Sequence, residues 1–205
     1  MPPADVRLSK PMLNLPNLLS LFRILLVPPL VVVLLTKFDG KEWWGLGLFL
    51  LAAVMDFLDG YLARRRQQVT RLGTLLDPAA DKILVSAAFI SLVELDPKVV
   101  PAWMVVVIIA REFAVTSLRS FAAAENLVIP AGVSGKIKTI VQIVAIALLI
   151  IYNQLGEFRH LAPLSLWVTV IITAYSGIEY FVRFGRLILR GGGQAPPSQP
   201  PASRV

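Results

Sequence analysis

The sequence contains no cysteine and a single histidine, His160, among its 205 residues. Disulfide bonds and thiolate metal sites are therefore excluded, and one imidazole cannot form a histidine cluster around a metal. Charged residues are also scarce, at 16% of the chain, and the 13 Asp and Glu are outnumbered by 20 Lys and Arg. A metal site in this chain must consequently be built from oxygen ligands, so carboxylates in apolar surroundings are the first residues to consider.

A cleavage site for a secretory signal is also missing from the first part of the sequence. Arg7 and Lys10 precede an apolar stretch that continues to Leu35 without the small residues that precede signal cleavage. We therefore expect this stretch to remain in the protein as its first membrane span.

Long apolar runs dominate the rest of the chain, which is 56% hydrophobic and has a mean hydropathy of +0.71. Because about 20 apolar residues cross a bilayer as a helix, the runs predict an all-α, polytopic membrane protein. We place six transmembrane helices near residues 16–36, 43–64, 74–94, 100–122, 137–153 and 162–189. We divide the chain into a short N-terminal segment (1–13), a membrane domain (14–190) and a disordered tail (191–205) that is rich in Gly, Pro, Ser and Gln.

Positive charge is distributed unequally between the two ends of these spans. The segments opposite the N-terminus carry few basic residues, namely Lys37, Lys41, Lys98 and Arg159. The other end carries most of the Lys and Arg, which predicts that it faces the cytoplasm and that both termini lie there. The net charge of +7 suits anionic lipid headgroups or a phosphorylated substrate, and we expect no nucleic acid as a partner.

Four aspartates interrupt the apolar pattern of the second and third predicted spans. Asp56 and Asp59 share one helix face, and Asp77 and Asp81 share another. Each would cost about 2.5–3.5 kcal/mol in the centre of a membrane helix, so the set needs a compensating cation or protein partner. The polar segment 64–71 is long enough to turn the chain back, so the two acidic faces can meet.

Such a cluster of carboxylates predicts a divalent metal site. In a low dielectric the four groups would repel one another and take up protons unless a cation lay between them, and hard oxygen ligands select Mg²⁺, Mn²⁺ or Ca²⁺. We expect two ions. A divalent-cation transporter could use the same carboxylates, but transporters usually contain two related halves and this acidic pattern occurs once in the sequence.

The acidic segment also resembles a known signature. It matches without departure the pattern of the CDP-alcohol phosphotransferase family of integral membrane enzymes, Asp56-x2-Asp59-Gly60-x2-Ala63-Arg64-x8-Gly73-x3-Asp77-x3-Asp81. Three further segments, 14–23, 110–119 and 135–142, look like the bacterial phosphatidylglycerophosphate synthase branch of this family. The resemblance covers about residues 14–185 and implies a location in the cytoplasmic (inner) membrane of a bacterium.

The resemblance implies a six-helix fold and transfer of a phosphatidyl group from CDP-diacylglycerol to an alcohol, with release of CMP. By similarity, Asp56, Asp59 and Asp77 are ligands of Mg²⁺ or Mn²⁺. Asp81 completes the site as a ligand or as the general base, and we favour the base.

Five other residues are assigned by similarity to CDP-diacylglycerol binding: Gly60, Ala63, Arg64, Gly73 and Asn17. Each assignment has a simpler alternative. The glycines could only allow close helix packing, Arg64 could be a loop charge that sets topology, and Asn17 could cap a helix.

A second group of charged residues predicts where the acceptor binds. A small dianionic acceptor such as sn-glycerol 3-phosphate needs a basic pocket, which four residues in the fourth and fifth spans would supply: Arg111, Arg119, Lys136 and Lys138. Arg111 could instead pair with Glu112. Residues two apart on a helix point to opposite sides, so both lysines serve one pocket only if the helix begins after Gly135.

Several alternatives stay open at this point. Inositol phosphate, serine or phosphatidylglycerol are other acceptors used in the family, and charge alone does not exclude them. Arg23 could extend to the membrane surface or contact phosphates, and Glu179 with Arg183 is an i, i+4 pair of structural character. Because members of the family are commonly homodimers, we expect a homodimer here.

Overall fold

The structure is a computed structural model that describes residues 15–66, 71–124 and 133–191. Six α-helices account for nearly all of these residues, and two short 3-10 helices, η1 (Tyr152–Gln154) and η2 (Gly156–His160), precede the last of them. The helices are α1 (Leu15–Leu35), α2 (Lys41–Arg66), α3 (Arg71–Leu95), α4 (Ala102–Ala124), α5 (Val133–Ile150) and α6 (Leu161–Gly191). No strand occurs in the described ranges. The prediction of six helices in an all-α fold is confirmed.

The largest difference from the predicted bounds is at α5. This helix begins at Val133, four residues earlier than predicted, and ends at Ile150. Gly135 therefore lies inside the helix, because a glycine weakens a helix by only about 1 kcal/mol and packing easily outweighs that cost. The condition under which Lys136 and Lys138 would both serve one pocket is not met. The predicted N-terminal segment 1–13 and all but the first residue of the predicted tail lie outside the described residues.

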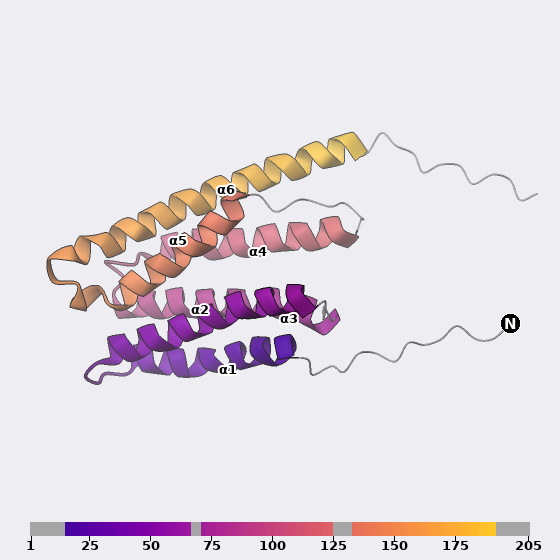
Figure 1. Ribbon diagram of the computed structural model, residues 1–205. Helices are drawn as coiled ribbons and strands as arrows, with labels where there is room; N and C mark the ends of the chain where they lie inside the picture. The colour runs from indigo at the N-terminus through magenta and orange to yellow at the C-terminus, as the bar shows by residue number, and fades with distance from the viewer. Residues whose placement is uncertain (1–14, 67–70, 125–132, 192–205) are drawn as a thin grey trace, which may run out of the picture.

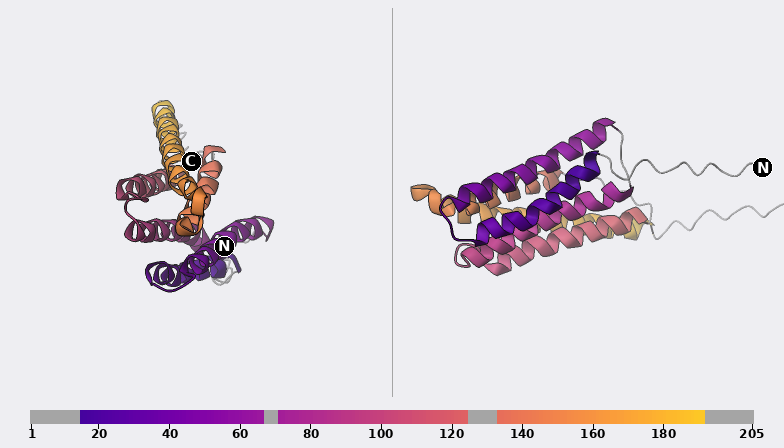
Figure 2. Two further views of the ribbon diagram at one scale, coloured as in Figure 1. Left: turned by 90° about the vertical axis from the view of Figure 1, so that its left-hand side faces the viewer. Right: turned by 90° about the horizontal axis from the view of Figure 1, so that it is seen from below.

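The helices run lengthwise through a single bundle (Figure 1). α1 packs against α2 and α3, α4 packs against α3 and α6, and α5 crosses obliquely to pack against α6. The start of α1, the end of α2, the start of α3 and the end of α6 lie at one end of the bundle, and the connections at 36–40, 96–101 and 151–160 lie at the other (Figures 1 and 2). We call these the polar end and the apolar end, for reasons given below.

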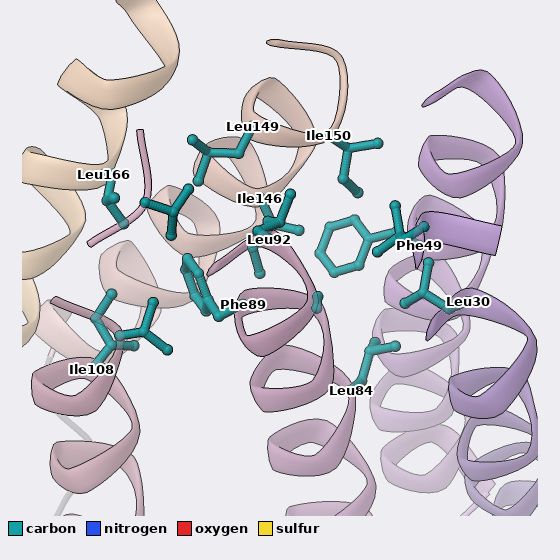
Figure 3. Close-up of a cluster of buried hydrophobic side chains, with 14 of the residues drawn as sticks. Leu30, Phe49, Leu84, Phe89, Leu92, Ile108, Ile146, Leu149, Ile150 and Leu166 are labelled. Carbon is teal, nitrogen blue, oxygen red and sulfur yellow. The ribbon is translucent and has the colours of Figure 1, made fainter. Parts of the chain in front are cut away.

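The hydrophobic core fills the half of the bundle nearer the apolar end. Five of its largest members come from five helices and meet in one cluster (Figure 3): Leu30, Phe49, Phe89, Ile108 and Ile146. Each is at most 1% exposed. This cluster ties α1, α2, α3, α4 and α5 together, so the helix ends at the opposite side of the bundle are held at fixed positions.

The outer surface is that of a membrane protein. Large apolar side chains are more than half exposed on every helix, as shown by Leu25, Val54, Ile90, Ile140 and Ile171. The helical segments Leu18–Leu35 and Gly156–Arg186 are each long and apolar enough to cross a bilayer. Because water would penalise such a surface and lipid does not, the exposed apolar side chains are explained by contact with acyl chains.

Tryptophan marks the apolar end of the bundle. Trp43 and Trp44 lie in the first turn of α2, Trp103 lies in the first turn of α4, and Trp167 is near the start of α6. All four are about half exposed or more, and the rings of Trp103 and Trp167 meet edge to face with centroids 5.6 Å apart. Tryptophan prefers the level of the lipid headgroups, so this end of the bundle lies at a membrane surface.

Candidate metal and phosphate site

Buried charges gather in the other half of the bundle. Arg23, Glu112 and Lys138 are each at most 8% exposed, and the polar side chains of Gln142 and Ser176 are buried close to the same level. A charge in such surroundings requires a partner of opposite sign or hydrogen bonds. The pairs that satisfy this requirement define the site.

Two consecutive helices carry the four predicted aspartates. Asp56 and Asp59 belong to α2, and Asp77 and Asp81 belong to α3. Only Asp56 and Asp81 have described side chains, and these two carboxylates are close enough to interact electrostatically. The described side chains contain no group of three or more potential metal ligands, and they include only half of the predicted set. The hairpin that the sequence predicts is present in the backbone.

Other predicted site residues also have side chains outside the described part of the chain: Asn17, Asp59, Gly60, Ala63, Arg64, Gly73, Asp77 and Lys136. Their backbone places them at the start of α1, the end of α2, the start of α3 and the start of α5. The start of α1, the end of α2 and the start of α3 lie at the polar end of the bundle, whereas α5 begins nearer its middle (Figure 1). Their roles stay predictions.

Arg23 brings a positive charge from α1 to the aspartate hairpin. Its side chain is fully buried, and its Nη1 donates a hydrogen bond to Asp56 Oδ1. Arg23 therefore does not extend to the membrane surface, which was one of its two predicted roles. The pairing shows that the position of Asp56 accommodates a cation, and the carboxylates of Asp56 and Asp81 are the hard oxygen donors that Mg²⁺ and Mn²⁺ prefer. The residues present fit a divalent metal.

Glu112 is the centre of a second buried cluster, between α4 and α5. One of its oxygens, Oε1, accepts hydrogen bonds from Lys138 Nζ and from Gln142 Nε2, the latter at 3.3 Å. The same oxygen is 3.5 Å from Arg111 Nη1. One carboxylate thus serves two cations, and the cluster carries one positive charge in excess. The predicted alternative, a simple Arg111–Glu112 pair, accounts for only part of this arrangement, because Lys138 is the nearer cation.

A small cavity joins this cluster to the aspartate hairpin. It has a volume of about 10 Å³ and its polar lining comes from α3, α4 and α5: Asp81, Lys82, Ser86, Glu112 and Gln142. This space holds about one water molecule or one hydroxyl group. Asp81 and Lys138 also interact electrostatically. The predicted base and the buried cations therefore belong to one continuous polar region.

The structure does not bring Arg119 into this region. Arg119 lies on α4 two turns beyond Arg111, and its side chain is exposed. Glu179 and Arg183 of α6 form the predicted i, i+4 ion pair. His160 lies in η2, at the apolar end, away from the buried charges.

The contribution of α6 to the surroundings of Arg111 was not predicted from the sequence. Arg111 Nη2 donates a hydrogen bond of 2.6 Å to Ser176 Oγ. The neighbouring Gly177 lies so close that a Cβ atom there would be 3.0 Å from Arg111 Cγ. The sequence feature that could have indicated this contact is the Ser176-Gly177 pair in an apolar helix. Such pairs of small residues also occur wherever membrane helices pack closely, so the pair alone does not indicate a site.

Several known proteins are similar to this chain in sequence. A family model described as CDP-alcohol phosphatidyltransferase matches residues 13–175. A CDP-diacylglycerol--glycerol-3-phosphate 3-phosphatidyltransferase of Bacillus subtilis (strain 168) is 46% identical over 185 residues, which cover 83% of this chain and 94% of that protein. The protein of the same name from Salmonella choleraesuis is 37% identical and covers 82% of this chain and 92% of its own length.

Solved structures with the same fold are more distant in sequence. Phosphatidylinositol phosphate synthase of Mycobacterium tuberculosis in apo form superposes with a TM-score of 0.62 at 16% identity, over 88% of this chain and 93% of that chain. Its complex with manganese and citrate gives a TM-score of 0.59 at 18% identity, over 83% and 82%. Its structure with CDP-DAG bound gives 0.60 at 18% identity, over 82% and 85%.

Proposed function

Because the chain belongs to the CDP-alcohol phosphatidyltransferase family, we propose that it transfers the phosphatidyl group of CDP-diacylglycerol to sn-glycerol 3-phosphate, forming phosphatidylglycerophosphate and CMP. The observation that carries the choice of acceptor is the 46% identity to the Bacillus subtilis protein named for this reaction, over nearly the whole of that protein. The buried excess of positive charge beside Asp81 supports the same choice, since it suits a phosphorylated acceptor.

The aspartate hairpin is the proposed metal site. Asp56, Asp59, Asp77 and Asp81 would hold two ions of Mg²⁺ or Mn²⁺, which neutralise the pyrophosphate of the lipid substrate when bound. The manganese in the distant M. tuberculosis structure agrees with a divalent ion, while the number and identity of the ions are our proposal. Gly60, Ala63, Arg64, Gly73 and Asn17 are proposed to bind CDP-diacylglycerol.

Asp81 is proposed to act as the general base. It would take the proton of the acceptor hydroxyl while that oxygen forms a bond to the phosphatidyl phosphorus and the bond from this phosphorus to CMP breaks. The cavity that Asp81 shares with Glu112 and Gln142 has the size of one hydroxyl group. The arrangement therefore offers a place for the attacking group beside its base.

Arg111 and Lys138 are proposed to bind the phosphate of the acceptor. Both cations lie beside Glu112, and a phosphate that enters the cluster can accept charge-assisted hydrogen bonds from them. Lys136 and the exposed Arg119 are proposed to attract the anion at the mouth of the site.

We further propose that the polar end of the bundle faces the bacterial cytoplasm, as the basic residues indicate, and that the protein is a homodimer with membrane lipids around it. The membrane domain is proposed to span residues 14–190.

The experiment that tests the function measures CMP release by the purified protein in detergent with CDP-diacylglycerol and Mg²⁺ or Mn²⁺. The acceptors compared are glycerol 3-phosphate, inositol phosphate, serine, phosphatidylglycerol and glycerol. We expect turnover with glycerol 3-phosphate alone. Efficient turnover of another acceptor would identify that acceptor as the substrate in place of glycerol 3-phosphate. Metal-dependent binding without CMP release would contradict an enzymatic role.

A further inference from the structure

We propose that α6 completes the acceptor site: Ser176 and Gly177 position Arg111, and the hydroxyl of Tyr180 binds the phosphate monoester of the acceptor. The inference rests on the proposed function, because it adds residues of α6 to the proposed acceptor site. It concerns a helix that lies outside the aspartate signature and outside the basic segments on α4 and α5.

The first argument is the fit between Arg111 and α6. Arg111 is 11% exposed in its side chain, so it needs partners along its whole length. Ser176 accepts a hydrogen bond from Nη2 at one end of the side chain, and the missing Cβ of Gly177 makes room for the aliphatic part at the other. The side chain is thereby held between α4 and α6, with its charge directed to the cluster around Glu112.

The second argument is a set of buried polar atoms that lack hydrogen-bond partners within the described ranges: Arg111 Nε, Thr173 Oγ1 and Tyr180 OH. Thr173, Ser176, Gly177 and Tyr180 share one helix face, since they follow the spacing i, i+3, i+4 and i+7. Tyr180 is also near enough to Arg111 to interact electrostatically. Unpaired buried donors are costly and rare in native proteins, and a cluster of them beside a cation is suited to binding an anionic group.

The chemistry of the donors selects a phosphate. Arg111 Nε and the Tyr180 hydroxyl both donate, and they lie beside the excess positive charge of the Glu112 cluster, so a group with several accepting oxygens and a double negative charge satisfies them together. Both substrates contain phosphate. The acceptor is favoured over the pyrophosphate of the lipid because the aspartate hairpin, proposed to bind that pyrophosphate, is built from α2 and α3.

Tyr180→Phe provides the sharpest test, because it removes only the unpaired hydroxyl. A hydrogen bond to a charged ligand would be lost, so the KM for glycerol 3-phosphate should rise about tenfold or more. The KM for CDP-diacylglycerol should not change, and the Tm without substrate should stay the same or rise, since no hydrogen bond of the free protein is broken. Tyr175→Phe is the matched control, because Tyr175 is 66% exposed on the same helix and should leave every parameter unchanged.

Gly177→Ala tests the positioning of Arg111 independently. The added methyl group would force the Arg111 side chain to move by a few tenths of an ångström, so the KM for glycerol 3-phosphate should rise several-fold while that for CDP-diacylglycerol stays constant. Gly185→Ala is the control on α6, since a Cβ there meets no atom within 4 Å. Ser176→Ala should act in the same direction as Gly177→Ala.

Binding of glycerol 3-phosphate without turnover supplies a second measurement. The acceptor should raise the Tm of the wild-type protein, and by less in Tyr180→Phe and Gly177→Ala. Equal losses for both substrates, or an acceptor KM and Tm shift that match the controls, would overturn the role of α6. If the wild-type protein itself releases no CMP with glycerol 3-phosphate, the proposed function fails and the inference fails with it, whereas normal wild-type turnover with unaffected variants removes the inference alone.

Discussion

The two halves of the bundle differ in their interiors. Toward the apolar end the interior consists of side chains such as Leu30, Phe49 and Phe89, whereas toward the polar end it contains Arg23 and Glu112. Exposed apolar side chains occur on the described surface of both halves, for example Phe57 and Trp103. The difference between the two interiors is therefore concealed from the acyl chains around the bundle.

This difference indicates what each half is for. Helices in a membrane gain little from the hydrophobic effect on packing together, so tight contacts between side chains must hold them. The apolar half supplies such contacts from all six helices. The polar half contains charges that are expensive in a membrane and are retained at functional sites. Changes in the polar half should therefore alter activity, and changes in the apolar half should alter stability.

The largest effect is expected from the proposed metal ligands. Replacing Asp56, Asp59 or Asp77 by Asn, or adding EDTA, should reduce CMP release by about 10³-fold or more, because metal ions contribute several kcal/mol of charge stabilisation. The Tm should fall far less. Asp96→Ala is the control near the apolar end: Asp96 Oδ1 accepts hydrogen bonds from the backbone N of Lys98 and Val99 at 3.1 and 3.2 Å, so the loss of this acceptor should lower the Tm and spare activity. Near-normal turnover in the three variants would refute the metal assignment.

Asp81→Asn should come next, with a kcat about 10²–10⁴-fold lower. Binding of CDP-diacylglycerol and of metal should persist, because a missing base affects the transition state and not the ground state. Parallel measurement of kcat and of CDP-diacylglycerol affinity checks this. If both decline together, Asp81 is a metal ligand and not the base.

Neutralising the buried cations should have a smaller and more selective effect. Arg111→Gln and Lys138→Gln should each raise the KM for glycerol 3-phosphate about 10- to 100-fold, since each removes charge-assisted hydrogen bonds to the phosphate. The KM for CDP-diacylglycerol should change little. Lys136→Gln is the comparison within α5, and we expect it to have the weaker effect. An equal rise in both KM values would make the cluster structural.

The smallest effect on activity is expected in the apolar half. A Cβ at Gly45 of α2 would lie 2.6 Å from Leu34 Cδ2 of α1, whereas one at Gly47 meets no atom within 4 Å. Gly45→Ala should therefore destabilise the protein by about 1–3 kcal/mol through overpacking and leave both KM values unchanged. Gly47→Ala should leave the protein equally stable or slightly more stable, because alanine favours a helix over glycine by about 1 kcal/mol, and thermal unfolding distinguishes the two variants. A change in either KM caused by Gly45→Ala would show that the halves are not separable.

The same division explains what could be predicted from the sequence. The six helices follow from apolar runs whose length matches a bilayer, and the hairpin of α2 and α3 follows from the polar segment 64–71, which separates two of these runs. Arg23 and Asp56, which form an ion pair, are 33 positions apart in the sequence. Arg111 and Ser176, which form a hydrogen bond, are 65 positions apart. Such contacts depend on how helices cross, and small residues such as Gly177 look alike in sequence whether they serve packing or a site.

The placement of the polar interior at one end of an otherwise lipid-facing bundle has a kinetic consequence. In the proposed reaction, CDP-diacylglycerol approaches by lateral diffusion within a single leaflet, whereas glycerol 3-phosphate arrives from water. The encounter with the lipid is then two-dimensional, and its frequency depends on the mole fraction of that lipid in the surface around the enzyme. Adding inert detergent should slow turnover even though the total quantity of substrate in the vessel is constant, because it dilutes the surface and leaves the volume unchanged.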